Sequence, residues 1–283
     1  MFTLNCKGRL VSLNKPVVMG ILNITPDSFH APSRPGSADE MLQKAGQMIT
    51  DGAAIIDVGA QSTRPGSDWI DPDTEWNRLS DLLPMLCEKF PATVFSIDTF
   101  HHSVAVQAVM HGAAMVNDVS AGNLDPLMVP SVASLKVPFV CMHMKGTPQT
   151  MSALATYPQL MPEIVDYFIE RISTCRKAGI KDIIIDPGFG FAKKGAQNFE
   201  LLNKLQDLQI LGCPLLLGVS RKSMITKTLG ITSGEALNGT TVLHTIGLLK
   251  GAAILRVHDV KEAMQAIKLV GMLAGSTNHS ELN

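Results

Sequence analysis

Residues 53–70 read Ala53-Ala-Ile-Ile-Asp57-Val-Gly59-Ala60-Gln61-Ser-Thr63-Arg64-Pro65-Gly-Ser-Asp-Trp-Ile70. The apolar run at the start of this segment predicts a buried strand, and the polar, Gly-containing stretch after it predicts a loop that carries a hydroxyl, a guanidinium and a proline. An apolar run followed by polar residues recurs along the chain. The resulting eight candidate strands cover residues 17–22, 53–58, 93–97, 114–117, 137–142, 182–185, 215–219 and 252–257. We therefore expect many strands to deliver polar side chains to one rim of the fold.

Segments with helical spacing separate these candidate strands. They cover residues 38–51, 72–89, 101–111, 124–134, 159–178, 197–207, 234–249 and 259–274. Strands that are apolar throughout and alternate with helices pair in parallel, because each crossover lays a helix on the sheet. Eight such units match a single α/β domain over residues 1–283, a (β/α)8 TIM barrel. Weak alternation about Lys7-Gly8 predicts a short N-terminal β-hairpin within residues 1–13, at the bottom of the barrel.

A doubly wound open sheet is the alternative architecture. It predicts a glycine-rich phosphate-binding fingerprint after the first strand. The segment in that place, Gly20-Ile-Leu-Asn23-Ile-Thr-Pro-Asp27, contains no GxGxxG. The barrel is therefore the favoured fold.

The composition narrows the class of function. The chain has 283 residues, of which 46% are hydrophobic, and a formal net charge of -1, so no broad basic field is available for nucleic acid. Five cysteines without a CxxC pair predict reduced thiols rather than a zinc or disulfide framework. No run approaches the ~18 apolar residues of a membrane span, and the first ten residues do not read as a signal peptide. We expect a cytoplasmic protein that acts on small molecules, without a membrane or nucleic-acid partner.

Polar side chains at the strand ends form the candidate site, because a barrel of this type places its chemistry there. They are Asn23, Thr63, Arg64, Asp98, Asn117, Asp186, Lys222, Arg256 and His258. A single Asp after a strand is more often a turn or cap residue, but six such strand ends are harder to explain in that way. Carboxylates that accept from ring N–H groups, beside Lys and Asn donors, suit a flat heterocycle. Arg256 and His258, one residue apart, project to the same side and suit an anionic phosphate group.

Eight motifs occur in an order that resembles the dihydropteroate synthase family. They are Met19-Gly-Ile-Leu-Asn23-Ile-Thr-Pro-Asp27-Ser-Phe29, Asp57-Val-Gly-Ala-Gln-Ser-Thr63-Arg64-Pro65-Gly66, Ser96-Ile-Asp98-Thr, Val116-Asn117-Asp118, Met142-His-Met-Lys-Gly-Thr-Pro, Asp186-Pro-Gly-Phe-Gly-Phe191, Ser220-Arg-Lys222-Ser and Arg256-Val-His258-Asp. The resemblance spans almost the whole chain. It implies the condensation of 6-hydroxymethyl-7,8-dihydropterin pyrophosphate with p-aminobenzoate, giving 7,8-dihydropteroate and pyrophosphate for folate synthesis. It also implies a sulfonamide target that works as a homodimer.

The resemblance further implies a role for each matching residue. The expected pterin contacts are Asp98, Asn117, Met142, Asp186, Phe191, Gly218, Lys222 and Arg256. The expected pyrophosphate contacts are Asn23, Thr63, Arg256 and His258, with Asn23 acting through Mg2+ as the metal residue. The expected p-aminobenzoate contacts are Phe29, Thr63, Arg64, Pro65, Phe191, Ser220 and Ser223, where residues 24–37 and 59–71 are mobile active-site loops. The residues expected to carry catalysis are Asp98, Lys222, Arg256 and His258.

One segment departs from the family pattern. Residues 30–36 read His-Ala-Pro-Ser-Arg-Pro-Gly where the family usually has a short Asp-Gly-Gly stretch. This segment leaves open a non-catalytic pterin-binding paralogue that has lost the pocket for the second substrate. A related pterin-dependent methyltransferase barrel, which would retain Asp98, Asn117 and Asp186, is a separate alternative. Thr63-Arg64-Pro65 and Ser220-Arg-Lys222 argue against the methyltransferase, which has no need of them. His101, His102 and His143 are too isolated in the sequence to predict a metal site.

Overall fold

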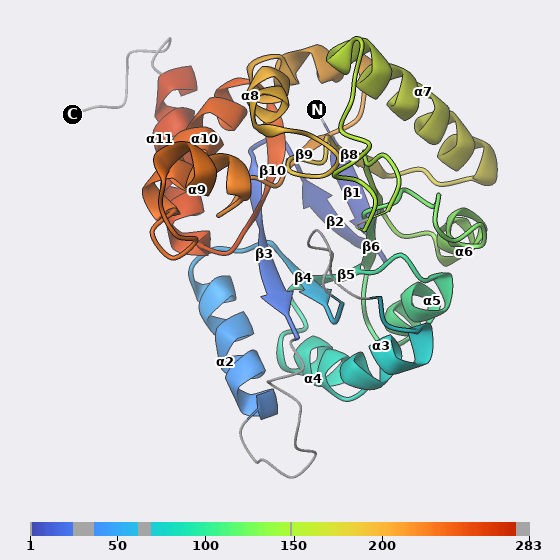
Figure 1. Cartoon of the computed structure of the whole chain (residues 1–283). Coiled ribbons are helices and arrows are strands. Elements are labelled where there is room, and N and C mark those ends of the chain that lie inside the picture. Colours follow the sequence, from blue (N-terminus) through green and yellow to red (C-terminus); the bar gives the residue numbers. More distant parts are fainter. Residues whose placement is uncertain (1, 25–36, 62–68, 148, 276–283) are drawn as a thin grey trace.

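Eight parallel strands close into a barrel in the computed structural model, which describes residues 2–24, 37–61, 69–147 and 149–275. The strands are β3 (Val17–Asn23), β4 (Ile55–Gly59), β5 (Val94–Asp98), β6 (Met115–Asp118), β7 (Phe139–Met142), β8 (Ile183–Asp186), β9 (Leu215–Leu217) and β10 (Ala252–Val257). Each strand pairs with the next along the chain, and β10 pairs with both β9 and β3, which closes the ring. Figure 1 shows the helices around the outside of this barrel. The predicted TIM barrel is confirmed, and the open sheet is excluded.

The helices lie between the strands in chain order. They are α2 (Ser37–Thr50), α3 (Pro72–Leu79), α4 (Leu82–Lys89), α5 (His102–Met110), α6 (Met128–Leu135), α7 (Leu160–Ala178), α8 (Gly195–Asn203), the 3-10 helix η1 (Leu205–Leu211), α9 (Ser223–Leu229), α10 (Leu237–Leu249) and α11 (Val260–Gly275). No helix in the described part of the chain is long and apolar enough to cross a membrane.

Two predicted helices are each divided in the structure. The segment 72–89 forms α3 and α4 with a break at Ser80 and Asp81. Pro84 explains the break, because it cannot donate to the carbonyl of Ser80 and is tolerated only in the first turn of a new helix. The segment 197–207 begins as α8 but continues as η1, so the prediction of one helix was wrong there.

The predicted N-terminal hairpin is also confirmed. Strands β1 (Thr3–Cys6) and β2 (Arg9–Ser12) pair antiparallel, and Lys7 and Gly8 between them both have positive φ. Two left-handed residues form the type of turn whose twist matches a two-residue hairpin. Leu4, Cys6 and Leu13 pack against the lowest inward-facing residues of the barrel strands, so the hairpin plugs the barrel at its amino end.

Side chains along each barrel strand alternate between two cores. Inward-facing residues form one cluster with the hairpin, comprising Met19, Ile55, Val94, Met115, Val140, Ile184, Leu216 and Ile254. Their outward neighbours pack under the helices in a separate, larger cluster. Because the period of a strand is two residues, positions an even number of residues beyond the inner cluster also face inward. This places Asp98, Asn117 and Asp186 in the mouth of the barrel.

Candidate active site

The carboxyl ends of the strands bring six of the predicted pterin contacts to the barrel mouth. Asp98 ends β5, Asn117 lies in β6, Met142 ends β7, Asp186 ends β8, Gly218 follows β9 and Arg256 lies in β10. Asp98, Asn117, Met142 and Asp186 are each at most 8% exposed. The same alternation turns Asp118 to the outside of the barrel, where its carboxylate accepts from the N–H groups of Ser120 and Gly122. Asp118 is therefore a turn residue, whereas its neighbour Asn117 faces the site.

Arg256 joins two carboxylates across the mouth. Its Nε donates to Asp57 Oδ2 at 2.6 Å, and its Nη2 donates to Asp98 Oδ2 at 2.6 Å. Asn117 Nδ2 donates to the same Asp57 oxygen at 2.9 Å. The other oxygens of both carboxylates, Asp57 Oδ1 and Asp98 Oδ1, are buried without a hydrogen-bond partner among the described residues. Asp98 therefore has a buried, unpaired acceptor in the mouth.

Asp57 is a site residue that sequence reasoning missed. It lies inside the apolar run of β4 rather than at the strand end, where polar side chains of the site are expected. The available signal was an acidic residue two positions after Ile55 within a predicted apolar strand, and the structure shows that its side chain is fully buried. An acidic side chain at such a position needs a buried cation or donor, and here Arg256 and Asn117 supply both.

Burial and the neighbouring charges shift the pKa values of Asp98 and Arg256 in the mouth. Burial raises the pKa of Asp98 to about 7, although Arg256 opposes the shift. Burial acts to lower the pKa of Arg256, but the carboxylates of Asp57 and Asp98 outweigh it and hold the pKa above its usual value. Arg256 therefore stays charged, while Asp98 titrates near neutrality.

Asp186 and Lys222 form a second polar pair on the other side of the mouth. Asp186 Oδ1 accepts from the N–H of Gly188 at 2.8 Å, and burial raises its pKa. Lys222 Nζ donates to the carbonyl of Phe189 at 2.5 Å and lies 4.8 Å from the centroid of the Phe191 ring. Burial lowers the pKa of Lys222 to about 8. The mouth therefore offers an acceptor, a donor and an aromatic wall within one small region.

Gly218 keeps this region open. A Cβ built on Gly218 would lie 3.6 Å from Asp186 Oδ2 and 3.7 Å from Lys222 Nζ. A larger side chain at this position would extend into the space between the two charged groups. The bare backbone fits the predicted role of Gly218 as a wall for a flat ligand.

A buried lysine that the sequence analysis did not single out holds the loop after β8. Lys193 Nζ donates to the carbonyls of Gly188 at 3.0 Å and Phe191 at 3.1 Å, and it lies 2.9 Å from His143 Nδ1. Burial lowers the pKa of Lys193 well below its usual value, and burial together with Lys193 lowers that of His143 to about 2. A neutral imidazole can accept from the amine, so Lys193 fixes the turn that carries Phe191.

The predicted anion-binding residues lie along the rim from β9 to β3. The N–H of His258 donates to Ser220 Oγ at 3.2 Å, which ties the end of β10 to the segment after β9. Ser223 is the first residue of α9 and is exposed, and Asn23 is exposed at the end of β3. Arg221 has a left-handed φ of 55° and pairs with Asp259, with Nη2 2.6 Å from Oδ1. This turn directs the following residue, Lys222, toward Asp186.

Four predicted contacts, Phe29, Thr63, Arg64 and Pro65, lie outside the described residues, as do most of the two predicted loops. Among the residues that the structure describes, no group of three His, Cys, Asp or Glu side chains is placed to hold a metal ion.

Comparison with known proteins gives one consistent result. Residues 19–258 match the model of the pterin binding enzyme family. The chain is 38% identical to the dihydropteroate synthase of Escherichia coli (strain K12) over 266 residues, covering 93% of this chain and 94% of the relative. It is also 38% identical to the dihydropteroate synthase of Bacillus subtilis (strain 168), covering 94% and 92% of the two chains.

Solved structures agree with the sequence relatives. A Yersinia pestis dihydropteroate synthase in complex with a sulfonamide drug superposes with a TM-score of 0.91 at 36% identity, covering 97% of this chain and all of that one. A Xanthomonas albilineans dihydropteroate synthase with 4-aminobenzoic acid superposes with a TM-score of 0.89 at 35% identity, covering 96% and 98%. The Xanthomonas albilineans enzyme in complex with 7,8-dihydropteroate superposes with a TM-score of 0.86 at 33% identity, covering 96% and 99%.

Proposed function

The chain belongs to the dihydropteroate synthases of the pterin binding enzyme family, and on that basis we propose which of its residues carry each part of the reaction. The reaction condenses 6-hydroxymethyl-7,8-dihydropterin pyrophosphate with p-aminobenzoate and releases pyrophosphate and 7,8-dihydropteroate. It is a group transfer from an oxygen to an arylamine nitrogen, in the pathway to folate.

Asp98, Asn117, Asp186 and Lys222 bind the pterin ring. The observation that carries this proposal is Asp98 Oδ1, which has no hydrogen-bond partner among the described residues. This oxygen is buried in the same mouth as Asp186. Carboxylates accept from the N–H and amino groups of the heterocycle, and Lys222 and Asn117 donate to its carbonyl and ring nitrogens. Met142, Phe191 and Gly218 form the apolar walls, and the guanidinium of Arg256 stacks over the ring.

Arg256, His258, Asn23 and Thr63 hold the pyrophosphate. Arg256 already carries a charge that two carboxylates stabilise, and His258 lies two residues further along the same strand end. Two donors on one side of a strand suit a multiply charged anion. The exposed position of Asn23 leaves its side chain accessible to a substrate phosphate or its metal.

Magnesium fits this rim through Asn23. The amide oxygen of Asn23 lies 3.6 Å from a Cβ built on Gly59, so the glycine leaves the space beside it free. Mg2+ keeps several waters and is bound by one or two protein oxygens together with substrate phosphates, so a full cage of carboxylates is not needed. When bound, the ion neutralises charge on the pyrophosphate.

Catalysis requires charge stabilisation rather than a protein nucleophile. Cleavage of the carbon–oxygen bond leaves negative charge on pyrophosphate, where Arg256 and His258 lie, and positive charge on the exocyclic carbon of the pterin. The ring delocalises that positive charge, and the carboxylate of Asp98 stabilises it. The arylamine nitrogen then bonds to the carbon and loses its proton to water. Positioning by the rigid strand ends supplies the remainder of the rate enhancement.

The second substrate binds beside Phe191, with Phe29, Thr63, Arg64 and Pro65 as further contacts and Ser220 and Ser223 near its carboxylate. The N-terminus of α9 supports this assignment, since Ser223 lies in the first turn, where free N–H groups favour an anion. The Yersinia pestis relative was solved with a sulfonamide drug, and we propose that sulfonamides compete with p-aminobenzoate here as well.

Pyrophosphate release is the decisive assay. The enzyme should release pyrophosphate from the pterin substrate rapidly only when p-aminobenzoate is present. A pterin-binding paralogue without activity would bind the pterin and release nothing in either case. A methyltransferase-like barrel would bind the pterin but show no dependence on p-aminobenzoate.

We also propose a homodimer and a cytoplasmic location. Val242 and Leu249 on α10, with Leu269 and Met272 on α11, are each at least half exposed, and these two helices lie side by side (Figure 1). Exposed apolar patches of this kind mark association surfaces. Sedimentation analysis tests the dimer. The five free cysteines fit a reducing compartment.

A further inference from the structure

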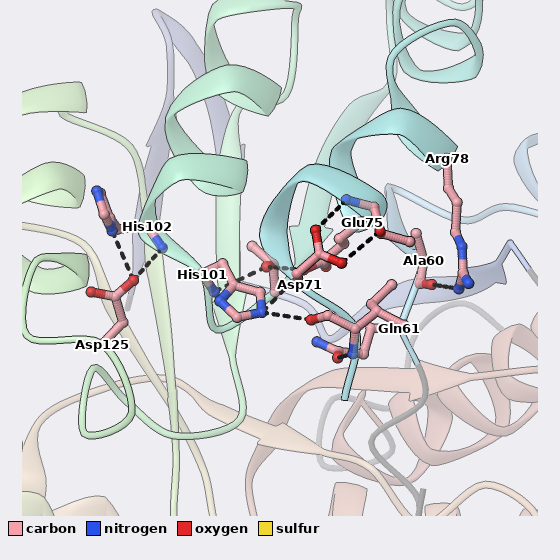
Figure 2. Close-up of polar contacts among 11 residues, drawn as sticks. Ala60, Gln61, Asp71, Glu75, Arg78, His101, His102 and Asp125 are labelled. Carbon is pink, nitrogen blue, oxygen red and sulfur yellow. Dashed lines mark hydrogen bonds and ion pairs between the residues drawn. The ribbon is translucent and has the colours of Figure 1, made fainter. Parts of the chain in front are cut away.

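A buried acidic residue on α3 lies behind the active site and has no part in the reaction described above. Glu75 is fully buried, and its Oε2 accepts from the hydroxyl of Thr99 at 3.1 Å. Thr99 directly follows Asp98, and its hydroxyl also accepts from the N–H of His101 at 3.1 Å. The His101 ring also lies next to Glu75, with its Nε2 3.9 Å from Glu75 Oε2. We call Glu75, Thr99 and His101 the neck cluster; Figure 2 labels Glu75 and His101.

The neck cluster contacts one end of the segment between β4 and α3. His101 Nε2 donates to the carbonyl of Ile70 at 3.2 Å. The N–H of Ile70 in turn donates to Gln61 Oε1 at 2.8 Å, so the two described ends of the segment are tied together. The ring of Trp69 packs on Phe100, with centroids 4.8 Å apart.

Arg78, which lies on α3 like Glu75, contacts the Ala60 end of the segment between β4 and α3. Its Nη1 donates to the carbonyl of Ala60 at 2.9 Å. Figure 2 shows Glu75 and Arg78 on α3, and His101 turned toward Gln61. His102, the next residue, is turned to the opposite side, where its backbone N–H and its Nδ1 both contact Asp125 Oδ2 at 2.8 Å.

We propose that Glu75, Thr99 and His101 are positioning residues of the synthase: they hold the Ile70 end of the segment between β4 and α3, and through the hydrogen bond from Ile70 to Gln61 its other described end, in register with the strand end that bears Asp98. The inference rests on the proposed function, in which that segment supplies Thr63 and Arg64 to the second substrate. None of the three residues of the neck cluster contacts substrate. They affect the position of the proposed p-aminobenzoate contacts relative to Asp98, which is a proposed pterin contact.

The charge state of Glu75 makes its role testable by a conservative substitution. Burial raises the pKa of Glu75 to about 8, Thr99 and Arg78 lower it, and Asp98 raises it. Together with His101, these are the groups that face the carboxyl. Near pH 7 the side chain is therefore mostly neutral. A neutral carboxyl can be replaced by the amide of glutamine, which has nearly the same shape and does not titrate.

The first experiment compares two adjacent histidines. His101→Ala removes the contact to Ile70, whereas His102→Ala removes only the side-chain contact to Asp125 and serves as the matched control. We expect His101→Ala to raise the KM for p-aminobenzoate about fivefold, the equivalent of one net hydrogen bond of about 1 kcal/mol. The affinity for the pterin substrate, measured alone by calorimetry, should stay within about twofold in both variants.

The second experiment uses the conservative substitution of the acid. Glu75→Gln should keep the wild-type KM for p-aminobenzoate at pH 6.5, whereas Glu75→Ala should raise it. Above pH 8 the wild-type KM should rise relative to that of Glu75→Gln, because only the wild-type side chain ionises and burial together with the charge of Asp98 disfavours a carboxylate at this position. Lys222 titrates in the same range in both proteins, so the ratio of the two KM values isolates Glu75.

Three results would overturn the inference. They are equal KM values in His101→Ala and His102→Ala, a loss of pterin affinity in His101→Ala, or a wild-type to Glu75→Gln ratio that does not change with pH. If Glu75→Ala does not fold, the histidine pair and Glu75→Gln still decide the matter. Absence of pyrophosphate release by the wild-type enzyme would instead be a failure of the proposed function, so the two failures are distinguishable.

Discussion

Arg256 and Asp98 are separated by 158 residues of sequence, and their Nη2 and Oδ2 atoms lie 2.6 Å apart in the barrel mouth. Asp57 accepts from the same guanidinium, so one cation is held by two buried carboxylates. The arrangement keeps Arg256 charged and fixed before any substrate arrives. Preorganised charge of this kind stabilises charge that develops during a reaction without further rearrangement.

Removal of Arg256 should destabilise the fold. Arg256→Ala leaves Asp57 and Asp98 facing each other with no cation, and loss of one partner of a buried ion pair costs about 3–5 kcal/mol. Urea denaturation of the ligand-free protein measures the change. The double variant Arg256→Ala with Asp57→Asn should recover part of the loss. A change below about 1 kcal/mol in the single variant would show that the pairing is not structural.

Arg256 and His258 should differ in which ligands they affect. Arg256→Ala should weaken binding of both pyrophosphate and the pterin, since the guanidinium serves both. His258→Ala should weaken only pyrophosphate binding, by about tenfold, the equivalent of a charge-assisted hydrogen bond of about 1.5 kcal/mol. Calorimetry with each ligand alone tests this. The dual role of Arg256 is wrong if its removal lowers pyrophosphate affinity and leaves pterin affinity unchanged.

The carboxylates of the mouth should be essential for pterin binding. Asp186→Asn and Asp98→Asn each replace an acceptor by a donor that faces the N–H groups of the ring, at a cost of about 2–4 kcal/mol in binding free energy. Asp182→Asn is the matched control, because Asp182 precedes β8 at the opposite end of the barrel, where it accepts from the N–H of Asn5. Unchanged pterin affinity in both mouth variants would refute the assignment.

Activity should pass through a maximum between two pKa values. The pKa of Asp98 near 7 predicts that kcat/KM rises as the pH passes 7 and the carboxyl ionises. The pKa of Lys222 near 8 predicts that kcat/KM falls again as the amine loses its proton. Asp98→Asn should lose the acidic limb of the profile. An unchanged acidic limb in that variant would assign it to another group.

Ionisation of Asp98, which should raise activity, should lower the stability of the fold. Its pKa is raised in the folded protein from an ordinary value near 3.8, so the stabilisation from holding the proton is complete below about pH 3.8 and is lost as the pH rises toward 7. Bound pterin, which uses the ionised form, should restore stability at neutral pH. Melting curves with and without ligand between pH 4 and pH 8 check this sign.

Two glycines of the segment from Gly188 to α8 should respond in opposite ways to alanine. Gly188 has φ of 72°, and a Cβ there would lie 2.1 Å from the carbonyl oxygen of His143. Gly188→Ala should therefore cost at least ~3 kcal/mol of unfolding free energy. Gly195 begins α8 with nothing within 4 Å of its Cβ position, so Gly195→Ala should be neutral or stabilise by up to ~1 kcal/mol. Equal effects in urea denaturation would contradict this account.

The barrel could be predicted from the sequence because each of its strands is a local signal. Apolar runs of four to seven residues mark the strands, and alternation within them decides which side chains face inward. The strand-end residues Asp98, Asn117 and Asp186 followed from this pattern, and the structure brings them to one mouth. The hairpin about Lys7 and Gly8 was predictable for the same reason, since its turn depends on two adjacent residues.

Helix boundaries were less predictable where backbone constraints competed with periodicity. The pattern of residues 72–89 continues across Ser80, but Pro84 does not allow one helix to continue there. Apolar spacing alone also does not distinguish α8 from the 3-10 helix η1 that follows it.

The sequence by itself determined the order of strands, the inward or outward direction of each side chain and the kinds of groups that meet in the mouth. Only the tertiary structure decided which groups pair. Arg256 contacts Asp57 across 199 residues because β10 closes the barrel next to β3, which pairs with β4 on its other side, and neither residue carries a local sign of the other. Burial is also decided by the tertiary structure. Glu75 is an ordinary acid in the first turn of α3 by its sequence, and its pKa is raised because it is buried beside Thr99 and His101, in the segment between β5 and α5. Desolvation and long-range charge depend on what surrounds a residue in space, and periodicity along the chain does not record that.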